Sequence, residues 1–267
     1  MIKISKNVMV ELKRNIISVK FLFSIIGICF ICLLFSRENL FIRENMPYYP
    51  AIYVYCACIS INGFIIPVIL CISSFNGAYS FCYDCKNHYG RYVISRTNAN
   101  HYAWGKVYAN IISSFWTTML GLSLYCIIIE ITLRNSILQD LNLVEGLAFH
   151  WRYYNNQPWL YYLAHNTILS AAATLWSTIS LTVSSFMPDV MLTLSVPIVA
   201  NYVLERFSIL YLPEYFNLFN LVNGVEMKSL SFPSNIFYSI ALFISLSLMF
   251  GFIFTYQLER RRINGFI

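Results

Sequence analysis

The sequence predicts an all-α polytopic membrane protein with six transmembrane helices. Hydrophobic residues make up 58% of the 267 positions and charged residues only 11%, and the mean hydropathy is +0.60. A soluble domain of this size carries about 25% charged residues. Several uncharged apolar runs also reach the roughly 20 residues that a helix needs to cross a bilayer. No long polar block could fold separately, so residues 1–267 are expected to form a single membrane domain.

The apolar runs give the expected spans. We predict them over residues 16–35, 51–74, 107–129, 160–187, 190–204 and 235–258. The fifth run is interrupted by Pro197 and is too short to cross the bilayer without tilt. It either continues into the segment that follows or ends partway. Met187-Pro188-Asp189, between the fourth and fifth runs, predicts a tight turn.

Residues 1–20 have the pattern of an amphipathic helix. Apolar residues recur at helical spacing on one side, while the other side carries Lys3, Lys6, Lys13 and Arg14. This pattern predicts a helix that lies in the membrane interface before the first span. Two roles remain open for it, a plain anchor and a surface that touches a partner. The basic stretch is too long for a signal peptide and no small-residue cleavage site follows it.

Charge bias predicts the orientation. Twelve of the 18 Lys and Arg residues lie in segments 1–20, 75–106 and 259–267, whereas segments 36–50, 130–159 and 205–234 hold six. Cytoplasmic segments of membrane proteins carry the excess of basic residues. Both termini and segment 75–106 are therefore expected in the cytoplasm. The net charge of +6 is explained by this sorting, and no nucleic-acid partner is expected.

Segment 75–106 is the longest basic interruption between two apolar runs. A loop that only reverses the chain does not need some 30 residues. Its aromatic and basic side chains include Tyr83, Tyr89, Tyr92, Tyr102, Trp104, Arg91 and Arg96. Tyr, Trp and Arg are enriched where protein partners dock. We expect a short helix that binds a soluble partner, and the alternative is a solvated basic loop that touches lipid.

The same segment resembles the first cytoplasmic loop of ABC-2 type transporter permeases. The resemblance is carried by Tyr83-Asp84, by Gly90–Thr97 (GRYVISRT), by Tyr102 and by Gly105-Lys106. The wider plan is similar too, with an amphipathic start, six spans and a basic C-terminus. One departure is Cys85-Lys86-Asn87-His88, where family members often carry Glu or Gly.

The resemblance implies that segment 75–106 contains a coupling helix that docks on an ABC ATPase subunit. The predicted coupling residues are Asp84, Arg91, Tyr92, Ser95, Arg96, Thr97 and Lys106. The chain has no GxxxxGK[ST] phosphate loop, so ATP and Mg²⁺ are expected on the partner and no cofactor in this chain. A second permease, identical or homologous, is implied, as is location in the bacterial plasma membrane. The alternative is a membrane scaffold or sensor subunit that transports nothing.

Polar and helix-loosening residues inside the spans suggest a translocation pathway or helix contacts. The candidates are Asn62, Phe64, Pro67, Pro197 and Asn201, and helix packing is the more common role for such residues. The spans lack the buried charges of an ion-driven transporter. These features favour ATP-driven export of an amphipathic, bacteriocin-like peptide, immunity against one, or a lipid-like cargo.

Other chemistry is not predicted. The sequence has no HExxH or GxSxG motif, so we expect a transport subunit with no catalytic residues. Cys82, Cys85, His88 and His101 could supply four zinc ligands, but two reduced thiols on a cytoplasmic helix are the simpler interpretation, and no metal is expected. Segment 205–233 is apolar but broken at Pro213. It predicts two short amphipathic pieces, which the resemblance makes re-entrant and which could otherwise lie on the surface.

Overall fold

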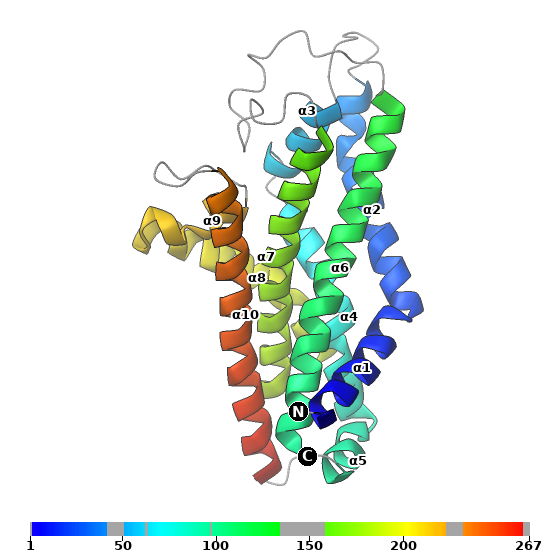
Figure 1. Ribbon diagram of the computed structural model, residues 1–267, viewed down its shortest axis with the longest axis vertical. Coiled ribbons are helices and arrows are strands. Elements are labelled where there is room, and N and C mark those ends of the chain that lie inside the picture. Colours follow the sequence, from blue (N-terminus) through cyan, green and yellow to red (C-terminus); the bar gives the residue numbers. More distant parts are fainter. Residues whose placement is uncertain are drawn as a thin grey trace.

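The chain forms a bundle of long helices (Figure 1). The computed structural model describes residues 2–41, 51–61, 64–96, 98–133, 158–222 and 232–263. These residues contain no strand. Six of their helices are long and apolar enough to cross a membrane, which confirms the all-α, six-span prediction.

The helices follow one another in short steps along the chain. They are α1 (Ile2–Ile16), α2 (Val19–Phe41), α3 (Ala51–Cys56), a π-helical turn (Ala57–Ile61), α4 (Ile65–Lys86), α5 (Tyr89–Arg96), α6 (Ala99–Leu133), α7 (Pro158–Phe186), α8 (Val190–Tyr211), a 3₁₀ turn (Glu214–Phe216), α9 (Leu218–Val222) and α10 (Phe232–Ile263). The candidate spans lie in α2, α4, α6, α7, α8 and α10.

Segment 75–106 differs most from expectation, because it is mainly helical and not a loop. Helix α4 continues to Lys86, α5 covers the middle, and α6 begins at Ala99. Hydrophobicity marks only the part of a helix that can lie in lipid, and backbone hydrogen bonding continues into polar turns beyond it. The membrane-length helices are therefore longer than the apolar runs that predicted them.

The expected second span is divided. Helix α3 and the π-helical turn end at Ile61, and α4 starts at Ile65. Pro67 lies in the first turn of α4, where the missing backbone N–H removes no intrahelical bond. The span that the structure supports is therefore Ile65–Lys86. Asn62, one of the predicted pathway residues, lies outside the described residues.

The turn between the fourth and fifth spans is confirmed. Residues 187–189 separate α7 from α8, and the Asp189 carboxylate accepts hydrogen bonds from the backbone N–H groups of Met191 (2.7 Å) and Leu192 (3.4 Å). This is an N-cap, which satisfies donors that the first turn leaves unpaired. Helix α8 then runs for 22 residues, so the predicted end of the fifth span at residue 204 is too early.

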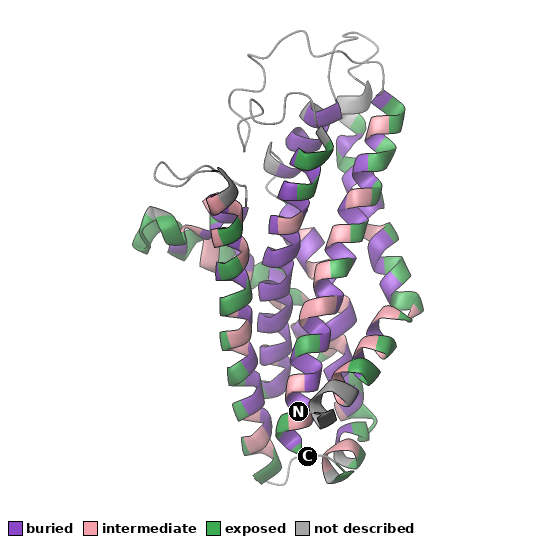
Figure 2. Ribbon diagram, viewed as in Figure 1, coloured by how far each residue is buried: buried purple, intermediate pink, exposed green. Residues whose placement is uncertain are grey.

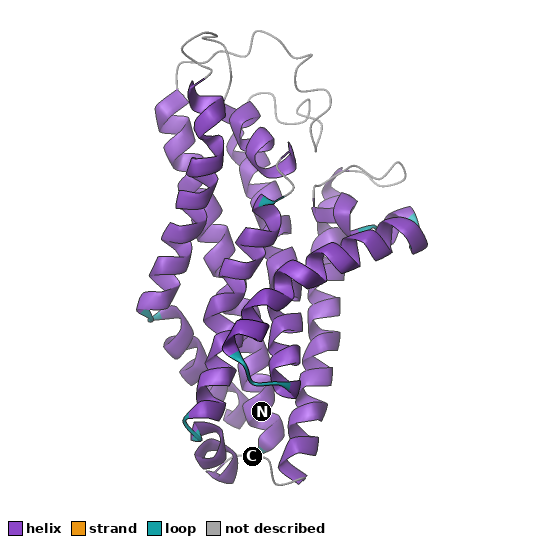
Figure 3. Cartoon of the chain, turned by 180° about the vertical axis from the view of Figure 1, so that it is seen from behind, coloured by secondary structure: helices purple, strands orange, loops and turns teal. Residues whose placement is uncertain are grey.

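Helix α7 is the centre of the bundle. Within the apolar part of α7 that is long enough to cross a membrane, 89% of the residues are buried. The corresponding share is 17% for α8 and 22% for α10. Small side chains such as Ala172, Ser177 and Ser180 let neighbouring helices approach α7 closely, and α4, α6, α8 and α10 all pack on it. Figure 2 shows α7 almost continuously buried, and Figure 3 shows α8 running obliquely away from the bundle.

Segment 205–233 is divided at Pro213, as the sequence predicts. Its first part completes α8, and the 3₁₀ turn and α9 follow the proline. Helix α9 packs against α8 and α7, and Ser208 of α8 accepts a hydrogen bond from the Leu218 N–H (3.2 Å). Residues 223–231 lie outside the described part of the chain.

A proline in α8 is compensated by a neighbouring helix. Pro197 has no N–H, so it cannot donate to the Thr193 carbonyl one turn earlier. The Ser180 hydroxyl of α7 donates to that carbonyl instead. The two helices are therefore tied at the place where α8 is weakest, and the two predicted pathway residues of α8, Pro197 and Asn201, lie on its buried face.

Removing that compensating donor is expected to destabilise the fold modestly. Ser180→Ala should lower the free energy of unfolding by about 1 kcal/mol, the usual net value of one hydrogen bond. The loss should shrink in the Pro197→Ala background, because residue 197 then supplies its own N–H. Unfolding in mixed detergent micelles measures both, with the exposed Ser195→Ala as control. If Ser180→Ala lowered the free energy of unfolding equally in the wild type and in Pro197→Ala, the Ser180 hydroxyl would not be replacing the N–H that Pro197 lacks.

Candidate functional site: a buried ion cluster beside an exposed helix

Four charged side chains meet where α1, α4 and α6 come together. Glu11 and Arg14 belong to α1, Asp84 to the last turns of α4, and Lys106 to the first turns of α6. Asp84 and Lys106 have side chains that are each 1% exposed, and Glu11 is also buried. We call these four residues the ion cluster. It lies at the end of the bundle that carries α1, α5 and the last turns of α10 (Figure 1).

Lys106 lies within 3.1 Å of three oxygen atoms from three side chains. Its Nζ lies 2.7 Å from Asp84 Oδ2, 2.8 Å from Glu11 Oε2 and 3.1 Å from Ser80 Oγ. An ammonium group has three donors and no acceptor. The Asp84 and Glu11 carboxylates provide opposite charges beside the ammonium group, and the Ser80 hydroxyl accepts a hydrogen bond from it.

Asp84 is satisfied on both carboxylate oxygens. Oδ1 accepts from the Arg14 guanidinium, while Oδ2 accepts from Tyr102 Oη at 2.8 Å in addition to Lys106. Arg14 also lies 3.8 Å from Glu11 Oε1. The two positive and two negative charges of the cluster therefore balance, and none is left buried without a partner.

The guanidinium of Arg14 responds to both burial and charge. Desolvation lowers the pKa of Arg14, but the hydrogen bond and the negative charge of Asp84, with Glu11, outweigh it, so this pKa is raised. Arg14 thus stays protonated at every physiological pH. It also places its guanidinium carbon 5.3 Å from the centroid of the Tyr89 ring on α5.

Helix α1 docks on the bundle through its polar side. Within residues 7–16, Glu11 and Asn15 are buried, whereas Met9 and Val10 are exposed. Helix α1 approaches α6 at Gly105, where an added Cβ would be in van der Waals contact with the Asn7 Cβ (3.4 Å). The charges of α1 that the sequence placed toward a partner are thus divided: Arg14 enters the ion cluster and Lys13 stays exposed. The side chains of Lys3 and Lys6 lie outside the described residues.

The short helix α5 projects from this cluster. Gly90 is buried and Val93 and Ile94 are half-buried against the apolar group that includes Tyr102. Tyr89, Tyr92 and Arg96 are exposed, with Tyr92 at 70%. The chain enters α5 through a two-residue turn at Asn87-His88, where His88 has φ 55°, a left-handed conformation in which His is enriched.

The predicted coupling residues therefore divide into two groups. Asp84 and Lys106 are buried and hold helices together, while Tyr92 and Arg96 face outward. Arg91 and Ser95 belong to α5, but their side chains lie outside the described residues, as does the whole of Thr97. Sequence reasoning did not place Glu11 in the site. Its only signal was an acidic residue on an otherwise basic helix, three positions before Arg14.

The remaining site candidates do not join this cluster. Phe64 is 72% exposed at the start of α4, and Pro67 is buried in its first turn. Cys82 contacts Thr193 Oγ1 of α8 at 3.3 Å. Among the residues that the structure describes, no group of three or more His, Cys, Asp or Glu side chains is arranged to hold a metal ion.

Comparison with known proteins leaves the site to be interpreted from its own geometry. No protein-family model matches the chain, and no curated protein or solved structure matches it.

Proposed function

We propose that this chain is the permease subunit of an ATP-driven ABC transporter of the ABC-2 type, in the plasma membrane of a bacterium. The observation that carries the proposal is α5, an eight-residue helix with exposed tyrosines and Arg96. It lies between two membrane-length helices, with two residues separating it from α4 and two from α6. Exposed Tyr and Arg side chains of this kind favour a soluble protein partner.

The ion cluster supports a mechanical role for α5. A force on α5 passes directly into α4 and α6, and their ends are joined by the Lys106–Asp84 contact (2.7 Å). Glu11 and Arg14 add α1 to the same rigid unit. Packed elements move as bodies because close-packed interiors do not deform continuously. Closure of a partner against α5 would thus tilt α1, α4 and α6 together.

The energy source in this proposal is a separate ATPase subunit that binds ATP and Mg²⁺. The 267 residues contain no phosphate loop. A second permease, identical or homologous, completes the pathway. The basic bias of segments 1–20, 75–106 and 259–267 places the α5 end in the cytoplasm under the positive-inside rule.

The proposed direction is export, and the proposed cargo is an amphipathic peptide of the bacteriocin type, for secretion or immunity, or a lipid-like molecule. Helix α7, at the centre of the bundle, contains no Asp, Glu, Lys or Arg. Its buried polar groups are hydroxyls, amides and His165. A helix core without charge suits a cargo with a large apolar surface better than a small ion, because ion-driven transport uses charged partners in the membrane.

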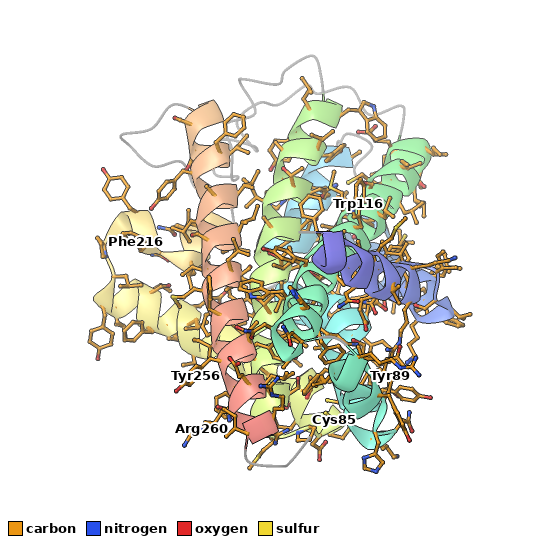
Figure 4. The ribbon with its side chains drawn as sticks, turned by 60° about the horizontal axis from the view of Figure 1, so that its bottom comes forward. Cys85, Tyr89, Trp116, Phe216, Tyr256 and Arg260 are labelled. Carbon is orange, nitrogen blue, oxygen red and sulfur yellow. The ribbon has the colours of Figure 1, made fainter. Side chains whose placement is uncertain are left out.

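A matched pair of variants tests the partner surface. Tyr92→Ala/Arg96→Glu alters α5, and Tyr256→Ala/Arg260→Glu alters exposed residues of the same types and spacing on α10. Figure 4 shows Tyr89 of α5 on the side of this end opposite Tyr256 and Arg260. In a pull-down from mild detergent, we expect the amount of ATPase that co-purifies with the α5 variant to be about tenfold lower than with the wild type. A loss of this size is usual for residues at the centre of a protein interface. The α10 variant should match the wild type.

Three results would contradict the proposal in different ways. An ATPase that is absent from the wild-type preparation would favour the scaffold or sensor alternative. Equal retention by the two variants would move the docking surface away from α5. Loss in both variants would indicate a general effect of charge reversal at this end.

A further inference from the structure

A second exposed feature lies beside the ion cluster, where α2 faces α4. Lys20, in the first turn of α2, places its Nζ 3.8 Å from the centroid of the Tyr79 ring and 5.8 Å from that of Tyr83. The rings of Phe75, Tyr79 and Tyr83 follow one another along α4, with centroids 5.5 Å and 6.2 Å apart. Lys20 is exposed and Tyr83 is 49% exposed.

The position of Lys20 is fixed by the contact between α2 and α4. One turn further along α2, Ser24 Oγ lies 3.4 Å from Asn76 Oδ1, and Asn76 Nδ2 donates to Thr117 Oγ1 of α6 at 3.0 Å. All three side chains are buried. These contacts therefore place the backbone of α2 at Lys20 beside the tyrosine rings of α4.

The charge of Lys20 is not used within the described residues. Lys20 takes no part in the ion pairs that join Arg14, Glu11, Asp84 and Lys106. A ring face attracts a cation but does not neutralise it. The ammonium group thus remains able to bind an anion, and the exposed side of Tyr83 offers a hydroxyl donor within the same group.

An apolar track begins next to this cation. Phe23, Ile26 and Phe30 follow Lys20 along α2 at helical spacing and are 57–69% exposed. Lys20 lies at the end of a membrane-length helix, which is the depth of lipid headgroups. The surface therefore combines a positive, tyrosine-lined end with an apolar strip of the kind that acyl chains cover.

We propose that Lys20, Tyr79 and Tyr83 bind the phosphate headgroup of an anionic phospholipid, with an acyl chain along Phe23, Ile26 and Phe30. Charge complementarity selects an anionic lipid over a zwitterionic one, because the choline or ethanolamine group of the latter would meet the same ammonium. The site is independent of the proposed transport activity, since it uses no residue of α5 or the ion cluster. A bound lipid would fill the surface between α2 and α4 beside α1.

The test compares lipid retention by the purified chain in a neutral detergent. Native mass spectrometry with added phosphatidylglycerol, phosphatidylcholine or inorganic phosphate gives the occupancy of each. We expect phosphatidylglycerol to be retained preferentially. Lys20→Gln should weaken its apparent affinity by about fivefold, and Tyr79→Leu by about twofold. Arg262→Gln, which removes an equal charge from the last turn of α10, is the control and should leave the affinity unchanged.

The outcomes separate the possible ligands. Equal affinity of Lys20→Gln and Arg262→Gln for phosphatidylglycerol would overturn the site. Equal retention of phosphatidylcholine would show apolar contact without headgroup recognition. If inorganic phosphate filled the site at the same concentration as phosphatidylglycerol, the site would be one for a phosphate ion. That result would overturn the lipid proposal. Lys20 is exposed, so its variant is expected to fold, and circular dichroism checks this.

Discussion

Replacing Lys106 with methionine should lower the free energy of unfolding by about 3–5 kcal/mol, the usual cost of breaking a buried ion pair. The change leaves Asp84 and Glu11 buried with Arg14 as their only remaining cation in the cluster. Methionine has a similar length, so the loss arises from charge and hydrogen bonding more than from a cavity. Unfolding in mixed detergent micelles, followed by far-ultraviolet circular dichroism, measures it.

Two further variants identify the cause. Lys86→Met removes an exposed lysine at the same end and should change stability by no more than about 0.5 kcal/mol. Lys106→Met/Glu11→Gln should recover part of the loss, since Arg14 and Asp84 then neutralise each other. If Lys106→Met proved as stable as Lys86→Met, the cluster would have to be hydrated and could not act as a buried link between helices.

The second large effect is expected at Gly77, where α4 meets α6. A Cβ at this position would lie 1.6 Å from Asn110 Oδ1 and 3.0 Å from the Asn110 Cα. Asn110 cannot simply move aside, because its Oδ1 accepts a hydrogen bond from Ser177 Oγ at 2.7 Å. Gly77→Ala should therefore destabilise the fold by about 2–4 kcal/mol, the sum of overpacking and one lost hydrogen bond.

Gly27 provides the matched control for that substitution. It also lies within a membrane-length helix, α2, but a Cβ there would meet no atom within 4 Å. Gly27→Ala should raise stability by about 0.5–1 kcal/mol, because alanine loses less backbone entropy on forming a helix. Opposite signs for the two variants in the same unfolding assay would confirm the close α4–α6 contact. Equal stabilisation by both would show that the helices are further apart than described.

Much of the membrane architecture could be predicted from the sequence, because its causes are local. Runs of apolar residues identified the six membrane-length helices found in the described part of the chain, since length and hydrophobicity decide whether a segment can cross a bilayer. The Met187-Pro188-Asp189 turn was equally predictable, because proline and a capping aspartate act on their immediate neighbours. The helix boundaries were less accurate, as the extension of α6 back to Ala99 shows.

The candidate site was only partly predictable. Tyr92 and Arg96 were expected to face a partner, and the structure exposes both. Asp84 and Lys106 were expected in the same group, but they are buried against α1. The difference arises because a sequence shows which charges exist and not which of them meet. Whether a charge is exposed or paired depends on the elements that pack against it.

The sequence by itself thus determined that this is a helical membrane protein, and it indicated the six membrane-length helices of the described residues and a basic, aromatic segment between the second and third of them. Only the tertiary structure decided that Arg14 and Asp84, 70 residues apart, form one ion cluster and that α5 stands exposed beside it. The physical reason is that crossing a membrane is a property of one segment, whereas neutralising buried charges requires partners from separate helices. Those partners are chosen by packing, to which Gly77 and the small residues of α7 contribute close contacts.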